Sequence, residues 1–148
     1  MSDRGQRLLH SPLLNKGTAF TERERDEFGL HGLLPPNVST MEEQLERTYA
    51  SFLAFHSDLE QNIYLSSLQD RNETLFFRLL LDHMQEMTPI IYTPVVAEAC
   101  RNWSKIFRRA RGIYLSPADR GRFDQVLENS PVDPSVIVVT DNERILGI

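Results

Sequence analysis

The sequence predicts a mainly α-helical fold that ends in the first β-hairpin of an α/β domain. Apolar residues recur at intervals of three and four over residues 41–87, and capping motifs precede these runs, as is typical of helices. Residues 136–139 are an unbroken β-branched run, typical of a strand buried on both faces. We therefore divide the chain into an irregular arm over residues 1–38, a helical domain over residues 39–130 and the start of a truncated α/β part over residues 131–148.

The first 38 residues contain many residues that interrupt regular structure, among them Pro12, Gly17, Gly29, Gly32 and the Pro35–Pro36 pair. A short helix over residues 21–28 is expected there, with Thr21 as its cap. Thr40 and Glu43 then have the spacing of a capping box and predict a helix with an apolar face.

The next two helices are predicted over residues 58–68 and after Asp70, which is expected to be the N-cap of the second one. Residues 70–73 repeat the capping pattern, and a broad apolar stripe follows over residues 75–87. Because the residue before a proline avoids the helical region, Thr88–Pro89 is expected to end that helix.

Short extended pieces are predicted over residues 90–92 and 113–115. Between them Thr93–Pro94 predicts a helix start, with threonine as N-cap and proline at the first helical position. Cys100 is expected on the buried face of that helix. Ser116–Pro117 predicts a further helix that carries Phe123.

The last 18 residues are expected to form a hairpin, with residues 136–139 as one strand and residues 144–148 as the other. Asp141–Asn142 would supply its two-residue turn. The chain ends within the second strand, which indicates a truncation.

Composition favours a globular protein that is soluble and cytoplasmic. The 148 residues are 41% hydrophobic and 25% charged, and the formal net charge is −5. No apolar signal core or membrane span is visible, so no membrane partner is expected. The single cysteine excludes an intrachain disulfide and fits a reducing compartment.

Several chemical groups are missing. No two glycines have the G-x-G spacing of a phosphate-binding loop, and Lys16 and Lys105 are the only lysines among 16 basic residues. The four histidines lack metal-ligand spacing, so no metal site is expected in this chain. A redox activity would therefore need its cofactor loop and its base from elsewhere.

Two residues are candidates for chemistry. Tyr92 precedes a predicted helix N-terminus, whose partial positive charge favours a phenolate; the alternative is a buried structural tyrosine with a bonded hydroxyl. Arg144 follows the predicted turn and has the planar fork that binds carboxylates. Its alternative is an edge-strand arginine paired with Glu143 or Asp141.

Residues 101–122 contain seven basic side chains and one acidic side chain, with aromatic residues between them. A nucleic-acid groove has this composition. The acidic remainder of the chain disfavours that partner, so no nucleic acid is expected.

Five segments stand out, at residues 14–20 (LNKGTAF), 31–36 (HGLLPP), 69–76 (QDRNETLF), 91–94 (IYTP) and 138–147 (VVTDNERILG). In their order and spread they resemble the N-terminal part of malic enzymes, and the bacterial NAD-preferring members of that family most.

The resemblance implies oxidative decarboxylation of L-malate to pyruvate and CO2 with NAD or NADP and Mg²⁺ or Mn²⁺. It implies that Tyr92 is the general acid that protonates the enolate and that Arg144 binds the substrate carboxylate near the cofactor. In the family the base lysine, the acidic metal ligands and the dinucleotide-binding domain follow the segment that ends here at Ile148. The chain alone is therefore expected to be inactive.

The resemblance also implies a homodimer or tetramer, and a candidate allosteric site for a fumarate-like ligand at Arg47 and Arg71. Fumarate-activated members have an acidic residue where this chain has Ser39, and plain interface roles for both arginines remain open. Asn142 stands where the family has glycine, and either residue tolerates a positive φ. The alternative function is a non-catalytic helical module for oligomerisation or regulation.

Overall fold

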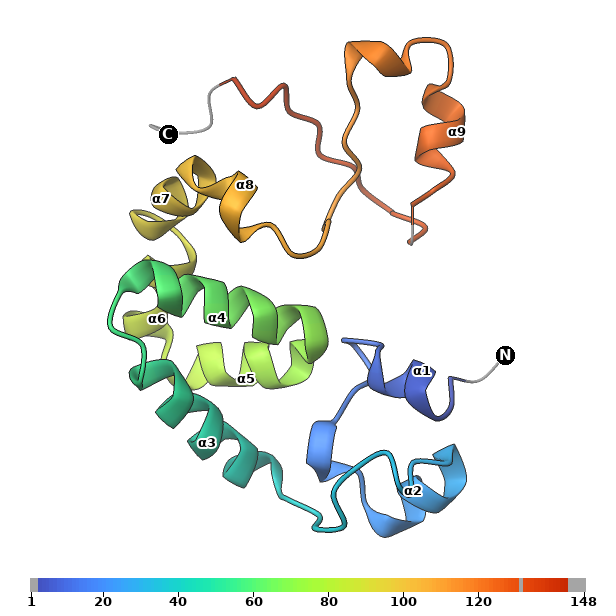
Figure 1. Ribbon diagram of the computed structural model, residues 1–148, viewed down its shortest axis with the longest axis vertical. Coiled ribbons are helices and arrows are strands. Elements are labelled where there is room, and N and C mark those ends of the chain that lie inside the picture. Colours follow the sequence, from blue (N-terminus) through green and yellow to red (C-terminus); the bar gives the residue numbers. More distant parts are fainter. Residues whose placement is uncertain (1–2, 131, 144–148) are drawn as a thin grey trace. The chain divides into compact units, whose positions relative to one another are not determined.

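The computed structural model describes residues 3–130 and 132–143. The chain forms two compact units, Met1–Ile106 and Phe107–Ile148. Figure 1 shows helices joined by turns and loops, and no strand is present in the described ranges. The prediction of a mainly helical protein is confirmed. Each helix within these ranges is too short or too polar to cross a bilayer.

The first unit holds most of the helices. They are α1 (Gln6–Leu9), the 3-10 helix η1 (Gly17–Ala19), α2 (Glu22–Phe28), α3 (Met41–Leu53), α4 (Asp58–Arg71), α5 (Glu73–Asp82), α6 (Met84–Ile91), α7 (Val95–Arg101) and α8 (Trp103–Ile106).

Two predicted helix starts are confirmed at the level of single hydrogen bonds. The Thr21 hydroxyl caps α2 and the Thr40 hydroxyl caps α3, and in each case a glutamate three residues later closes the capping box. Such a box satisfies two backbone N–H groups that the helix itself leaves without partners.

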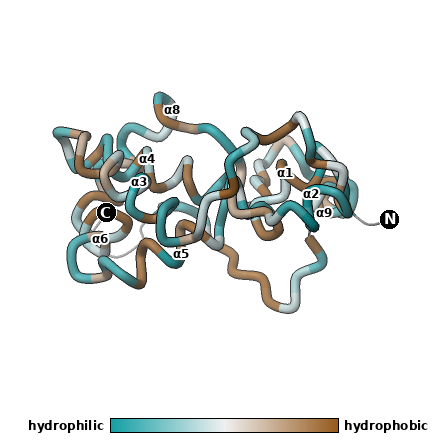
Figure 2. The backbone as a smooth tube through the Cα atoms, turned by 90° about the horizontal axis from the view of Figure 1, so that it is seen from below, coloured by the Kyte–Doolittle hydropathy of each residue, from teal (hydrophilic) through white to brown (hydrophobic). Residues whose placement is uncertain are grey.

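The main core lies between α3, α4, α5, α6 and α7. Helices α4 and α5 lie side by side (Figure 1) and make the most extensive contact between any two elements. Hydrophobic and hydrophilic stretches follow one another along the backbone of these helices (Figure 2). The core side chains that are essentially inaccessible to solvent are Phe52, Leu65, Leu68, Leu79 and Met87.

A smaller apolar cluster holds the first 38 residues together. Leu8, Phe20 and Leu30 are buried in it. The rings of Phe20 and Phe28 meet edge to face, with 6.4 Å between their centroids. This cluster is separate from the core of the main bundle.

The start predicted for α5 needs a correction. The capping pattern over residues 70–73 does not open a helix at Asp70; α4 continues through Arg71, and Asn72 caps α5 by accepting a hydrogen bond from the Leu75 N–H at 3.0 Å. This start allows Leu75 and Phe76 to enter the core.

The helix predicted over residues 75–87 is divided at His83, which ends α5 and precedes α6. Pro89 does not end a helix but lies inside α6, which continues through Ile91, so the extended piece predicted over residues 90–92 is wrong. Met87 and Ile90 are buried in the core. Their burial outweighs the single hydrogen bond that a proline removes.

The predicted start of the next helix is also wrong in detail. Pro94 rather than Thr93 occupies the N-cap of α7, no side chain caps that helix, and the Thr93–Pro94 peptide bond is cis. Val95 and Ala99 take the buried positions, so Cys100 is exposed and not buried as expected.

The second unit contains the 3-10 helix η2 (Pro117–Asp119) and α9 (Phe123–Leu127). The strand predicted over residues 113–115 is wrong, since these residues form no strand. The helix predicted from Ser116 is divided into η2 and α9. Ser116 and Asp119 form a capping box at η2.

The predicted β-hairpin is not formed in the described residues. Val136 to Val139 run without a strand partner and are 67–90% exposed. A strand needs a neighbouring backbone to satisfy its N–H and C=O groups, and residues 132–143 supply none. The turn is partly as expected, because Asn142 has a positive φ of 59°. The predicted returning strand, residues 144–148, lies outside the described residues.

Candidate functional site

Tyr92 lies between α6 and α7 in the first unit. Its N–H donates to the Thr88 carbonyl at 2.9 Å, and its carbonyl accepts from the Val96 N–H at 2.8 Å. The backbone of Tyr92 is therefore hydrogen-bonded to both flanking helices, which fixes where the side chain leaves the chain.

The side chain of Tyr92 points to solvent. The residue is 53% exposed, and within the described part of the chain its hydroxyl makes no hydrogen bond. The alternative of a buried structural tyrosine with a bonded hydroxyl is therefore wrong. An exposed hydroxyl on a fixed backbone is available to a ligand.

A surface pocket of about 250 Å³ lies close to Tyr92 in sequence and ends at Ile91. Its lining combines a polar edge of α4 with apolar residues of α5 and α6: Asn62, Ser66, Gln69, Phe76, Phe77, Leu80 and Ile91. No charged side chain lines this pocket, so it offers no cation to a carboxylate.

Arg144 lies outside the described residues, so its surroundings are not part of the site geometry. The turn that precedes it is described. The Glu143 N–H donates to the Asp141 carboxylate at 3.1 Å, and the Asn142 N–H donates to the Thr140 hydroxyl at 3.1 Å.

Arg47 and Arg71 are both exposed, on α3 and at the end of α4. Arg47 Nη2 donates to the hydroxyl of Ser39 at 3.3 Å, and Ser39 is itself buried. Among the described residues, the Arg71 guanidinium has no hydrogen bond or ion pair, and no such bond joins the two arginines. The Arg71 carbonyl accepts from the side-chain amide of Asn15 at 2.9 Å.

His83 packs as an aromatic residue. Its ring stacks on Tyr49, with 3.7 Å between centroids, and its Nδ1 lies 3.9 Å from a Glu86 oxygen. The Tyr49 hydroxyl donates to the same glutamate at 2.9 Å. Because ionised Tyr49 would lose this bond and face a carboxylate, Glu86 raises the pKa of Tyr49.

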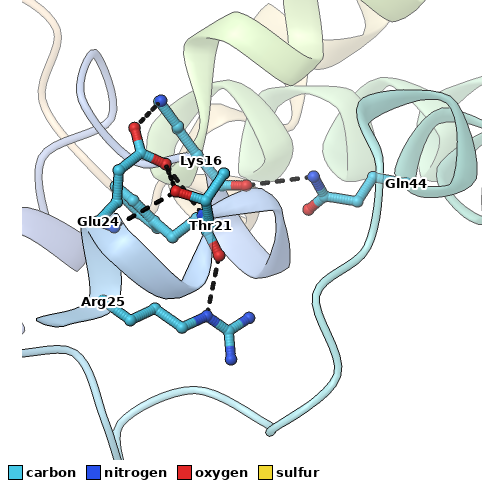
Figure 3. Close-up of polar contacts among 6 residues, drawn as sticks. Lys16, Thr21, Glu24, Arg25 and Gln44 are labelled. Atoms are coloured by element: carbon cyan, nitrogen blue, oxygen red, sulfur yellow. Dashed lines mark hydrogen bonds and ion pairs between the residues drawn. The ribbon is translucent and has the colours of Figure 1, made fainter.

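A polar network in the arm was not predicted from the sequence. Figure 3 shows Arg25 Nε donating to a backbone carbonyl, that of Phe20 at 2.9 Å, and the Gln44 amide donating to the Lys16 carbonyl at 3.1 Å. Both side chains are buried. Their partners are backbone atoms, which carry no side-chain signature, so no residue spacing in the sequence signals these bonds.

Lys16 also forms an ion pair with Glu24 (Figure 3). This contact is the main cause that lowers the pKa of Glu24, and hydrogen bonds from Thr21 add to it. The folded state therefore favours the ionised carboxylate. The stabilisation is complete above the unfolded-state pKa of about 4.3 and is lost as the pH falls through the lower pKa of the folded state.

We expect Lys16→Met to lower the free energy of unfolding by about 0.5 kcal/mol at pH 7, because the lysine is half exposed and solvent screens the pair. The difference from wild type should shrink below about pH 4. Urea unfolding at pH 7, 5 and 3 measures it. When Glu24 is replaced by glutamine, Lys16→Met should have no pH-dependent effect on the free energy of unfolding. The same pH dependence in the Glu24→Gln variant would show that the ion pair is not its cause.

The described residues do not fit a metal ion, since nowhere in 3–130 and 132–143 do three histidine, cysteine or acidic side chains come together as ligands. A metal ion would therefore need ligands from outside these ranges.

Residues 69–148 match the family of the malic enzyme N-terminal domain, which is more than half of the chain. The chain belongs to this family. Its relatives include the NAD-dependent malic enzymes of Aeromonas hydrophila, 55% identical, Edwardsiella ictaluri, 57% identical, and Acinetobacter baylyi, 54% identical. Each similarity extends over 145 residues, which is 97% of this chain and 26% of the relative. This malic-enzyme chain thus spans about a quarter of the length of those relatives.

Proposed function

We propose that the chain is the N-terminal portion of a malic enzyme that converts L-malate to pyruvate and CO2 with NAD and a divalent metal ion, Mg²⁺ or Mn²⁺. The observation that carries this proposal is the 54–57% identity to NAD-dependent malic enzymes over 97% of the chain. NAD is proposed over NADP because the names of these relatives specify it. The cytoplasm is the proposed compartment.

We infer that Tyr92 is the general acid. After loss of CO2, the enolate of pyruvate needs a proton on its terminal carbon, and the Tyr92 hydroxyl would supply it. The tyrosine would then regain its proton from solvent. The exposed hydroxyl and the two backbone hydrogen bonds that fix Tyr92 support this role.

The base, the metal ligands and the dinucleotide-binding domain would come from sequence that the relatives have beyond the region matched here. We also propose that residues 136–148 complete their hairpin in the presence of that sequence. The exposure of Val136 to Val139 supports this, since four β-branched side chains and their backbone groups lack a neighbouring strand within the described ranges. The domain division at residues 38 and 130 is part of this proposal.

The test is malate oxidation with NAD and Mn²⁺, measured by NADH absorbance. It compares the 148-residue chain with a version extended to the length of the relatives. Activity in the extended protein and none in the short chain would support the proposal. Absence of activity in both, with both folded, would overturn it.

In the extended protein, Arg144→Lys is expected to raise the malate KM about 10-fold and to change kcat less. Lysine keeps the charge but replaces a two-pronged fork with a single point of contact. Steady-state kinetics with malate as the varied substrate measures this split. If the KM is unchanged, Arg144 has a structural role, such as an ion pair with Glu143 or Asp141.

Arg47 and Arg71 are proposed as an allosteric site for a small dicarboxylate such as fumarate. Two exposed guanidinium groups match the two carboxylates of such a ligand. The neutral Ser39 that contacts Arg47 differs from the acidic residue of fumarate-activated members. Fumarate titration of the extended enzyme tests the proposal, with Arg71→Met as the variant that should not respond.

A second candidate function is self-association through this domain, as a homodimer or tetramer. Phe77 and Leu81 lie four residues apart on α5, Met84 begins α6, and all three are about half exposed or more. Large exposed apolar side chains near one another in the chain are typical of an interface. Light scattering of wild type and Leu81→Glu separates a dimer from a monomer.

A further inference from the structure

Residues 12–18 contact the junction between α4 and α5. The side-chain amide of Asn15 donates to the carbonyl of Arg71, the last residue of α4, at 2.9 Å. Nearby, the N–H of Glu73, the first residue of α5, donates to the Pro12 carbonyl at 2.9 Å. The Asn15 side chain also accepts from the Gly17 N–H at 2.8 Å, which closes a turn within the segment.

The same segment contacts the start of α3. The Gln44 amide donates to the Lys16 carbonyl at 3.1 Å and accepts from the Thr18 N–H at 3.3 Å. The Thr18 carbonyl accepts from the N–H of Ser39, just before the α3 cap, at 3.0 Å. Gln44 is buried, so its side-chain amide would be costly to leave unpaired.

Gly17 permits this contact. Its φ is +57°, and a Cβ at this position would lie 2.5 Å from the Oε1 of Gln44. With any larger residue the Gln44 amide would have to shift away from Gly17, which disturbs its hydrogen bonds to the segment. The close approach therefore depends on glycine for a reason besides its backbone conformation.

We propose that residues 12–18 form a strap that holds the start of α3 and the α4–α5 junction together, with Gln44 over Gly17 as its closing contact. Release of the strap frees Ser39 and Glu73 in one event, although 34 residues separate them in sequence. The strap also contacts the surroundings of both arginines. Asn15 binds the Arg71 carbonyl, and the Thr18 carbonyl binds the N–H of Ser39, whose hydroxyl accepts a hydrogen bond from Arg47.

A dicarboxylate that bridges the arginines would therefore favour the closed strap, and closure would in turn favour the dicarboxylate. This effect of a dicarboxylate rests on the anion-binding role proposed above for Arg47 and Arg71. The proposal of the strap is independent of that role.

Hydrogen exchange of the 148-residue chain tests the strap through the amides of Ser39 and Glu73. Gly17→Ala is expected to accelerate both amides together, by 10-fold or more. Gly32→Ala is the matched control, because Gly32 also has a positive φ, +80°, but a Cβ there meets no atom within 4 Å. If both amides exchange as in wild type, or equally fast in the control, the proposal is wrong.

Gln44→Met is a second variant that tests the strap even if Gly17→Ala does not fold. Methionine has a similar length but forms neither hydrogen bond, and it leaves the backbone at Gly17 unaltered. The same two amides should again accelerate together; acceleration of Ser39 alone would contradict a single strap. Fumarate should slow both amides in wild type. If fumarate has no effect while Gly17→Ala accelerates exchange, the anion site is wrong and the strap stands.

Discussion

Tyr92→Phe in the extended enzyme is expected to lower kcat for malate oxidation by about 10²- to 10⁴-fold, the range that a positioned general acid contributes. The substitution removes one oxygen from an exposed side chain whose hydroxyl has no bonding partner among the described residues. The fold and the affinity for malate should therefore remain close to wild type. NADH production and malate binding by calorimetry measure the two quantities separately.

A partial reaction makes this test more specific. Reduction of oxaloacetate to malate by NADH moves a hydride without protonating an enolate carbon, so Tyr92→Phe should retain it. Exchange of the methyl protons of pyruvate with deuterated water requires that proton transfer and should fall with kcat. The matched control is Tyr114→Phe, at a tyrosine that is similarly exposed. Equal losses in both partial reactions would assign Tyr92 a structural role.

Helix starts with local caps could be predicted from the sequence, because a capping box involves residues only three apart. The starts of α2 and α3 were predicted for this reason. The α4–α5 junction was not. Asp70 and Asn72 both have capping side chains, and the choice between them depends on which start buries Leu75 and Phe76 in the core.

Features that depend on distant backbone groups could not be predicted. Pro89 is expected to end a helix on local grounds, yet burial of Met87 and Ile90 keeps α6 intact around it. The run over residues 136–139 has strand composition, but composition supplies no partner strand. The contacts of Gln44 join elements 26 and 28 residues apart, beyond any local periodicity.

In the candidate site, too, local sequence features could be predicted and features that depend on distant contacts could not. Tyr92 was chosen from the sequence for its place before a predicted helix and for its motif, and its role as general acid stays a prediction. Its exposure follows from how α6 and α7 meet. The segments that resemble the family include residues 14–20, and the structure gives a physical reason for part of that motif. Asn15, Lys16 and Gly17 each form or permit a contact with the helical bundle.

Arg25→Met is expected to be the most destabilising of these substitutions, by at least about 3 kcal/mol. The Arg25 residue is 2% exposed. Its guanidinium donates to the carbonyls of five residues at 2.7–3.3 Å, namely Thr18, Phe20, Pro35, Pro36 and Asn37. Methionine fills much of the same volume but leaves most of these carbonyls without a donor. Urea unfolding followed by circular dichroism measures the loss.

Two control variants show whether the hydrogen bonds of the Arg25 guanidinium, rather than its charge or its place on α2, account for the loss of stability. Arg23→Met changes an exposed arginine on the same helix and should alter the free energy of unfolding by less than about 0.5 kcal/mol. Arg25→Lys keeps the charge but has a single nitrogen, which cannot reach carbonyls on both sides of a planar group. It should therefore recover only a small part of the loss. Full recovery with lysine would mean that charge, and not the five-donor geometry, holds residues 18–37 in place.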